Sequence, residues 1–339
     1  MSVKSSIRRP SQLGPTWRAD LAPYARPDRH VAVWQVVNTF VPYFALWAAM
    51  ITTIAMGLPL WVTLILAVPA ALFFMRIFIF FHDCGHGSFF ASPRANRLFG
   101  YLTGILTFTP YYDWSSSHAK HHATTGNLDK RGTGDMWTMT VAEYRAAPWY
   151  RRLAYRVFRN PAVLFTIAPL ILFLILQRLP GRDDKPRDRR SVWITNAAIA
   201  AILVVAALTI GLRAYVLIQL SIMLVAGSIG VWLFYVQHQF QGVYWARGAE
   251  WDFVRSAMEG SSYYKLPRVL QWFSGNIGLH HIHHLQPRIP NYHLQRCYEE
   301  VPAMQAVKPV TLRTSLKSLF LNLWDEEKQQ LVSFRALKD

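Results

Sequence analysis

Cysteine is scarce in this 339-residue chain, which contains two, Cys84 and Cys297. Two thiols cannot build a disulfide framework or a cysteine-based metal site, so the sequence excludes both. Charge is scarce as well, because Asp, Glu, Lys and Arg together make up 16% of the residues, against about 25% in a typical globular protein. Such a composition argues against a soluble protein.

The N-terminus lacks the short apolar core and the small-residue cleavage site of a secretory signal peptide. We therefore expect residues 1–33 to stay on the protein as a cytosolic tail. Acidic residues are also few, 19 against 36 Lys and Arg, which gives a net charge of +17. In a chain this apolar, basic residues are more typical of cytoplasmic loops and of contacts with anionic lipid than of nucleic-acid binding.

Apolar and aromatic residues are abundant: hydrophobic residues make up 52% of the chain, with 13 Trp, 15 Tyr and 20 Phe. A hydrocarbon core about 30 Å thick is crossed by roughly 20 apolar helical residues. Four runs fit this length and are predicted to span the bilayer: residues 34–56, 58–81, 192–212 and 215–236. Short turns within each pair predict two helical hairpins, and hence an all-α integral membrane protein.

Lys and Arg gather in four regions: residues 1–33 hold six, 81–160 hold ten, 178–190 hold six and 237–339 hold twelve. Positive charge marks the cytoplasmic side of a membrane, so all four regions are predicted to be cytoplasmic. Residues 161–177 join two of these regions and are therefore predicted to be in-plane or re-entrant, and residues 98–110 are too short to span. We expect a membrane domain over residues 34–310 with a cytoplasmic helical cap, followed by a cytosolic tail at 311–339.

Nine of the twelve histidines fall at the predicted cytoplasmic ends of these spans. They form three clusters and one single position: His82 and His86; His118, His121 and His122; His280, His283 and His284; and His238 at the end of the fourth span. Spacings of three and four place the imidazoles of a cluster on one face of a helix. One such pair is a weak signal, but three clusters at one membrane face indicate a metal centre.

Imidazole binds zinc, copper, iron and nickel. A single zinc site takes three or four protein ligands, so eight or nine histidines exceed it. Two octahedral irons with positions left for oxygen account for the number better, although two zincs remain an alternative. The second nitrogen of each ligand needs a partner. Candidates are Asp83, Asn127, Asp135, Gln237 and Asn276, together with Asp113, Asp129 and Gln239, each of which is equally consistent with a helix cap or loop residue.

The motifs HDCGH, HAKHH and HHIHH, in this order around two hairpins, resemble the three histidine boxes of the membrane fatty-acid desaturases. The phrases HHATTGNLDKRGTGDMWT, WLFYVQHQF, GSSYYKLPRVLQWFSGNIG and HHLQPRIPNY are similar to the bacterial and cyanobacterial acyl-lipid branch. That branch includes Δ12 (ω-6) desaturases and relatives that act at Δ5 or Δ9. The resemblance extends from about residue 30 to 310.

The resemblance implies that the eight histidines of the clusters are iron ligands, and His238 corresponds in position to an additional ligand. His281 is expected to face away, and His30 and His293 to be structural or surface residues. The implied reaction uses O2 and two electrons to introduce a cis double bond into acyl chains of membrane lipids, with Δ12 favoured. A Δ9 or Δ5 desaturase and a related di-iron hydroxylase are the alternatives.

Neither end carries a cytochrome b5 segment with a His-Pro-Gly-Gly signature, so we expect a separate donor of the ferredoxin or cytochrome b5 type. Basic residues that could dock it are Arg151, Arg152, Arg156, Arg159 and residues 187–190, although positive-inside topology and lipid headgroups explain them equally well. Aromatic residues that could line an acyl-chain site are Phe89, Phe90, Phe108, Tyr111, Tyr112, Trp114 and Trp137. A metal transporter would place its ligands near the bilayer midplane, whereas these clusters lie outside it. The expected location is therefore a membrane, the inner one in a bacterium, with the active site on the cytoplasmic side.

Overall fold

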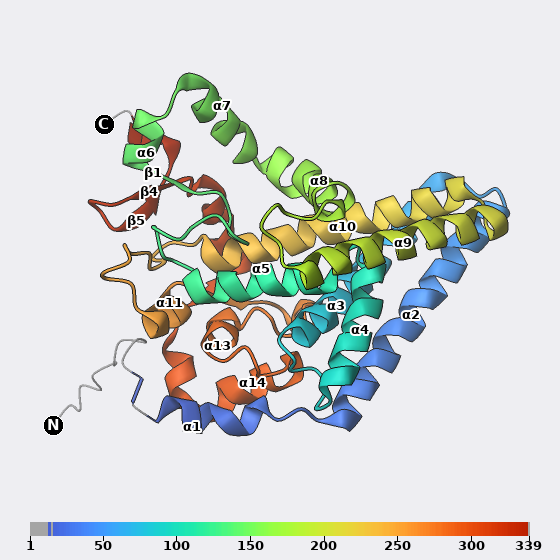
Figure 1. The fold of residues 1–339 in the computed structure, drawn as a ribbon, viewed down its shortest axis with the longest axis horizontal. Coiled ribbons are helices and arrows are strands. Elements are labelled where there is room, and N and C mark those ends of the chain that lie inside the picture. Colours follow the sequence, from blue (N-terminus) through green and yellow to red (C-terminus); the bar gives the residue numbers. More distant parts are fainter. Residues whose placement is uncertain (1–12, 15, 338–339) are drawn as a thin grey trace.

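The computed structural model describes residues 13–14 and 16–337 of the chain. Four of its helices are long and apolar enough to cross a membrane: α2 (Arg29–Ala55), α3 (Leu60–Gly85), α9 (Pro186–Thr209) and α10 (Leu212–His238). They form two hairpins that extend from one side of the molecule, and the shorter elements form a cap at their other end (Figure 1). The predicted fold class, an all-α membrane protein with two helical hairpins, is confirmed.

Each hairpin turns at a glycine with a positive φ angle, Gly57 at 68° and Gly211 at 85°. Residues with a Cβ rarely adopt this conformation, so glycine allows the tight reversal between the paired helices. The helices are longer than the predicted spans. α2 begins five residues earlier, after Asp28, whose side chain accepts hydrogen bonds from the backbone N–H groups of His30 and Val31. α3 continues four residues past the predicted span, to Gly85, and so carries the chain into the cap.

α3 lies at the centre of the bundle, where it packs against α2, α4 and α10. Small side chains on α3, including Ala67, Ala70 and Ala71, are fully buried and allow close approach to the apolar side chains of its neighbours. The outer faces of the bundle are exposed and apolar, with Leu208 of α9 at 81% exposure. A lipid environment would cover this face.

The cap is built from short helices and two small sheets. Its helices are α1 (Trp17–Leu21), α4 (Pro93–Leu106), α5 (Tyr111–Thr124), α6 (Val141–Ala146), α7 (Trp149–Phe158), α11 (Phe253–Glu259), α12 (Arg268–Phe273), α13 (His280–Leu285), α14 (Asn291–Glu300) and α15 (Leu312–Ser315). One sheet joins β1 (Met139–Thr140), β4 (Leu323–Asp325) and β5 (Gln330–Val332), and the other pairs β2 (Tyr263–Lys265) with β3 (Pro309–Thr311).

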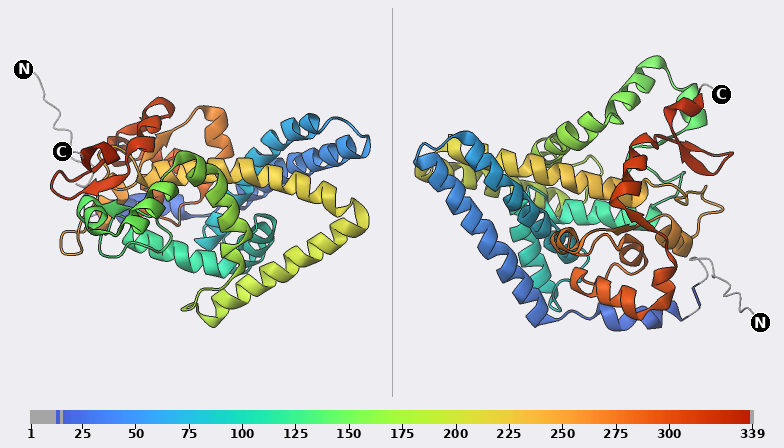
Figure 2. Two further views of the ribbon diagram at one scale, coloured as in Figure 1. Left: turned by 90° about the horizontal axis from the view of Figure 1, so that it is seen from above. Right: turned by 180° about the vertical axis from the view of Figure 1, so that it is seen from behind.

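The sequence did not predict these strands, and they change the expected C-terminal boundary. The predicted tail at 311–339 is folded onto the cap over its described part, because β4 pairs in parallel with β1 (Figure 2). Leu323 and Trp324 of β4 are buried, at 0% and 1% exposure. At the other end, Leu21 of α1 is fully buried against the cap. The rest of the predicted N-terminal tail, residues 1–12 and 15, lies outside the described residues.

The segment predicted to be in-plane or re-entrant contains a π-helical turn (Val163–Ile167), α8 (Ala168–Leu174) and a 3₁₀ turn (Leu176–Arg178). It follows α7 after a bend of 64°. α8 packs against α10, where a side chain at Gly227 would lie 2.9 Å from Cβ of Pro169. That this segment does not span the bilayer stays a prediction.

Gly227→Ala is expected to lower the stability of the fold by about 1–3 kcal/mol, since the new methyl group would press α8 away from α10. Gly230→Ala is the matched control, because Gly230 lies on the same helix and a Cβ there has open space around it. This control is expected to be neutral or to stabilise by up to about 1 kcal/mol through helix propensity. Thermal unfolding of both variants in detergent measures the difference, and equal shifts would contradict this close contact.

Candidate metal centre

Four elements bring the predicted histidines together at the base of the cap. α3 supplies His82 in its last turn, with His86 directly after the helix. α5 supplies the second cluster, α13 the third, and His238 is the last residue of α10. Because α3 and α10 continue from the membrane bundle, the site is fixed to the ends of two spanning helices.

The nine histidines form two adjacent groups. The first is His82, His86, His118, His122 and His283, and the second is His121, His238, His280 and His284. Within each group one nitrogen per ring lies within 4.8 Å of the others. The rings of His122 and His284 stack across the boundary, with centroids 4.1 Å apart.

The helical spacing explains how each cluster divides between the groups. His118 and His122 are four residues apart on α5 and belong to the first group. His121 precedes His122 by one residue, so its side chain points about 100° away around the helix axis and belongs to the second group. α13 divides in the opposite sense, because His280 and His284 enter the second group and His283 the first. Each of these two helices therefore contributes to both groups.

Ring nitrogens within the groups face each other at short distances. Pairs of Nε2 atoms 3.0–3.1 Å apart are His121–His238, His238–His280, His280–His284, His118–His122 and His122–His283. A neutral imidazole has one N–H donor and one lone pair, so a chain of such contacts cannot be satisfied by hydrogen bonds at every ring. Convergent lone pairs are the arrangement that a metal cation satisfies.

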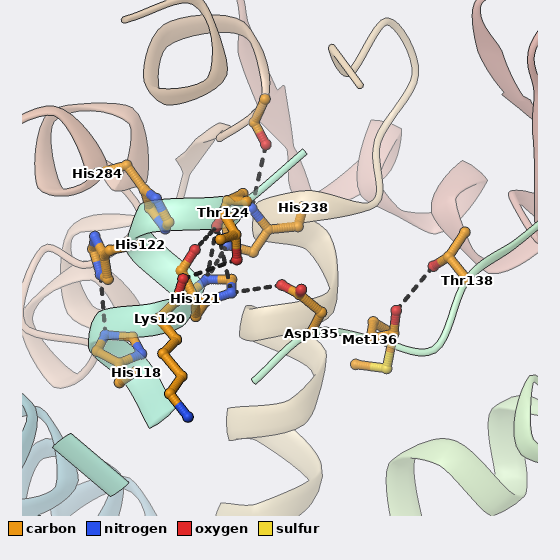
Figure 3. Close-up of polar contacts among 12 residues, drawn as sticks. His118, Lys120, His121, His122, Thr124, Asp135, Met136, Thr138, His238 and His284 are labelled. Carbon is orange, nitrogen blue, oxygen red and sulfur yellow. Dashed lines mark hydrogen bonds and ion pairs between the residues drawn. The ribbon is translucent and has the colours of Figure 1, made fainter. Parts of the chain in front are cut away.

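Three histidines have their tautomer fixed by a partner at Nδ1. Asp135 Oδ1 lies 2.7 Å from Nδ1 of His121 (Figure 3). Asp83 Oδ1 lies 3.0 Å from Nδ1 of His82. The carbonyl oxygen of Gly260 lies 3.2 Å from Nδ1 of His238. Carboxylate and carbonyl oxygens only accept, so each Nδ1 donates its hydrogen and Nε2 keeps a lone pair directed into its group.

The surroundings keep His122, His283 and His284 neutral. Burial holds the pKa of His122, His283 and His284 well below the usual value, and neighbouring imidazoles lower it further. Neutral imidazole is the form that binds a metal. In the described part of the chain, buried Nε2 of His86 has no hydrogen-bond partner, which is costly for a polar atom unless a cation completes its contacts. Both observations fit a metal site.

Asp83 connects the first group to α14. Its Oδ2 accepts hydrogen bonds from the backbone N–H of Asn291 at 2.7 Å and from the Asn291 side chain at 2.9 Å. Gln35 of α2 donates to Oδ1 of Asn291 at 3.1 Å and extends this network. Sequence reasoning missed Asn291. The available signal was its position in HHLQPRIPNY, seven residues after His284.

Of the five predicted supporting residues, Asp83 and Asp135 contact a histidine of the groups. The other three make bonds elsewhere: Asn127 accepts from the backbone of Asp129, Gln237 donates to Ile277 O, and Asn276 donates to Asn291 O. The side chain of Asn127 bonds within its own loop. Gln237 holds the backbone that precedes α13, and Asn276 holds the backbone that follows it. Nearness in sequence did not reveal these directions.

The remaining candidates also lie apart from the histidine groups. Asp129 pairs with Arg247, and Gln239 bonds to Arg159. Burial raises the pKa of Asp113 to about 6, with the neighbouring Asp184 carboxylate adding to the effect. The contacts of Asp129 and Gln239 give these two residues structural roles.

The three remaining histidines lie outside the two groups, and one of the predicted aromatic residues, Trp114, contacts a histidine of the first group. Nε2 of His281 lies 3.0 Å from Met304 O, outside both groups, as expected. His293 bonds to Tyr24 O, and His30 lies in the first turn of α2. Trp114 stacks on His118 with centroids 4.3 Å apart, whereas Trp137 packs against Tyr155 and is not beside the groups.

Comparison with known proteins places this arrangement in a family. The sequence model for "Fatty acid desaturase" matches residues 59–314, which contain all nine histidines. A protein named "Fatty acid desaturase" from Bacillus subtilis (strain 168) is 47% identical over 318 residues, covering 94% of this chain and 90% of that protein.

More distant relatives match a shorter region. The "sn-1 acyl-lipid omega-3 desaturase (ferredoxin)" of Synechocystis is 29% identical over 70% of this chain and 65% of its own length. The chloroplastic "sn-2 acyl-lipid omega-3 desaturase (ferredoxin)" of Arabidopsis thaliana is 30% identical over 70% of this chain and 53% of its own length. The family match over residues 59–314 includes the helices that carry the histidine groups, and the chain belongs to the fatty acid desaturase family of oxidoreductases.

Proposed function

We propose that the two histidine groups hold two iron ions, one in each group. The observation that carries this proposal is the division of nine converging imidazoles into groups of five and four. Zinc would suit imidazole ligands, but zinc has no redox chemistry, and desaturation is an oxidation. Iron supplies redox chemistry with the same ligands.

The bound metal would supply activation of O2 for removal of hydrogen from an unactivated methylene pair, a reaction beyond any side chain. The balanced conversion is –CH2–CH2– with O2, two electrons and two protons giving –CH=CH– and two molecules of water. The chain's own residues orient and protect the ligands. Asp83, Asp135 and the carbonyl of Gly260 hold the hydrogen at Nδ1 of their histidines. Seven of the nine imidazole side chains are buried, which limits the access of water.

The proposed substrates are acyl chains of membrane lipids, desaturated at the Δ12 (ω-6) position. Support for the carrier comes from the four exposed apolar helices and from the two relatives named acyl-lipid desaturases. Support for Δ12 comes from the phrases shared with the bacterial and cyanobacterial branch. The same two relatives are named omega-3, so the position of the new bond is the part that most needs measurement.

The proposed topology places the metal groups on the cytoplasmic side, where the basic segments also lie. Electrons would come from a separate donor protein, of the ferredoxin or cytochrome b5 type. The names of the Synechocystis and Arabidopsis relatives include ferredoxin, which supports the first type.

Expression in a host that lacks Δ12 unsaturation, followed by mass spectrometry of intact lipids, tests the proposal. We expect new diunsaturated or Δ12 chains on glycerolipids, and none in cells that express a His283→Ala variant. A new bond at Δ9 or Δ5 would overturn the position but keep the reaction. A hydroxylated chain without a new double bond would overturn desaturation itself.

A further inference from the structure

Residues of α6, α7 and the C-terminal 3₁₀ turn (Phe334–Leu337) line a cavity of about 490 Å³ that is open to the surface. Four of its lining residues are on α7: Trp149, Arg152, Leu153 and Arg156. Spacings of three, four and seven place these side chains on one face of the helix. Tyr144 and Arg145 of α6 line the opposite wall. The cavity therefore combines three guanidinium groups with aromatic and aliphatic side chains.

None of the three arginines of this cavity forms an ion pair with an acidic side chain in the described part of the chain. The ion pairs among residues 13–14 and 16–337 involve other side chains. Arg156 is held in place, because its Nε donates to Oη of Tyr144 at 2.6 Å and its guanidinium lies 4.5 Å from the ring of Phe334. Arg145 and Arg152 are exposed. Three cations around one cavity repel each other unless an anion binds between them.

Arg159, which the sequence grouped with these residues, is different. It is 3% exposed and donates to Oη of Tyr235 at 2.9 Å and to Oε1 of Gln239 at 3.2 Å. It therefore fastens the end of α7 to α10 and is not part of a docking face. The predicted basic surface is smaller by this one residue, and two of the remaining arginines, Arg152 and Arg156, line the cavity.

An apolar stripe on the same helix borders the cavity and shares Leu153 with it. Tyr150, Leu153 and Val157 are 62%, 54% and 50% exposed, at helical spacing. Exposed apolar residues continue beyond the bend at Ile167, Ile171 and Ile175. An amphipathic helix with aromatic and basic residues is typical of the membrane interface.

The contact of α8 with α10 relates α7 to the bundle of spanning helices. Pro169 of α8 meets α10 at Gly227, eleven residues before His238, or about 16 Å along the helix axis. The chain thus passes from the cap through α7 into the bundle of spanning helices. In a membrane that covers the exposed apolar helices, this route would bring the cavity to the level of the lipid headgroups.

We propose that this cavity binds the phosphate of an anionic glycerophospholipid, with Arg145, Arg152 and Arg156 as donors. Planar guanidinium groups match phosphate oxygens with paired hydrogen bonds. The neighbouring stripe enters the acyl layer, which explains its exposure. A polar electron-donor protein would leave this stripe in contact with water, so the lipid is the better occupant.

Native mass spectrometry of the full-length protein in detergent, titrated with dioleoyl phosphatidylglycerol or dioleoyl phosphatidylcholine, tests the site without using turnover. Arg152→Gln is expected to weaken phosphatidylglycerol binding roughly tenfold, and Arg145→Gln/Arg152→Gln by more. Arg151→Gln is the matched control, because Arg151 is exposed on the same helix but does not line the cavity. The control is expected to bind within about twofold of the parent protein. Thermal unfolding checks that each variant is folded.

Equal binding of the two lipids, or unchanged phosphatidylglycerol binding by the double variant, would overturn the proposal. Displacement of the lipid by low-millimolar inorganic phosphate would assign the cavity to free phosphate and would also overturn it. If the double variant instead keeps its lipid and loses electron transfer from reduced ferredoxin, the cavity would belong to the donor protein. A loss of phosphatidylglycerol preference confined to the cavity variants supports the headgroup site.

Discussion

His283→Ala is expected to lower turnover at least about a thousandfold and to remove the metal of the first histidine group. His283 lies within that group, with Nε2 3.0 Å from Nε2 of His122. A metal that stabilises charge by several kcal/mol contributes this much to the rate, at about 1.4 kcal/mol per factor of ten. Elemental analysis of purified protein, together with turnover, measures both effects.

Because the histidines form two groups, variants in different groups are expected to lose different ions. His283→Ala and His280→Ala remove neighbouring residues of α13, but each is expected to lose a different ion and to retain about one of two. His281→Ala is the control, because His281 lies between them and contacts Met304 O instead of either group. It is expected to keep both ions and to lose about 1 kcal/mol of stability through its hydrogen bond. Full metal content in the two ligand variants would refute the assignment.

Asp83→Asn is expected to reduce metal affinity or turnover by about 10–100-fold, although the side chain keeps its shape. The carboxylate accepts on both sides, from Nδ1 of His82 and from two N–H groups of Asn291. An amide has one oxygen and one NH2, so it can accept on one side only. With its NH2 toward His82 it would favour hydrogen at Nε2, where the lone pair is needed, and the reverse orientation opposes the donors of Asn291.

Metal titration of the apo-protein, by spectroscopy or calorimetry, measures the effect of Asp83→Asn on each group. Asp129→Asn is the control, because Asp129 is exposed and pairs with Arg247 at the surface. Its effect on metal affinity is expected to stay within about twofold. Parental affinity in Asp83→Asn would show that Asp83 positions α14 without orienting His82.

Hydropathy and histidine spacing were enough to predict the hairpins and to select the residues that converge. Lipid-facing helices must be apolar along their length, so the signal is local and strong. The division of the histidines was not predictable in this way, because it depends on how α5 and α13 are rotated toward each other. Asn291 was missed for a related reason: its partner Asp83 is 208 residues away.

The C-terminal segment shows the same limit. β4 pairs with β1 across more than 180 residues, and each strand has two or three residues. Strands this short carry little periodicity, so the sequence favoured a tail. Asn127, Gln237 and Asn276 were plausible partners because they lie near the clusters in sequence, but proximity along the chain does not determine side-chain direction.

The sharing of α5 and α13 between the two histidine groups sets an order of assembly. Neither group is complete until His283 or His284 has been synthesised, after both hairpins have been made. Loading of the proposed metal ions would therefore be a late step, and it would join segments that are far apart in the chain. Since the free energy of metal binding contributes to the free energy of folding, the bound ions would stabilise the packing of the cap. Withholding iron during synthesis should leave inserted helices with a loosened cap, open to proteases on that face.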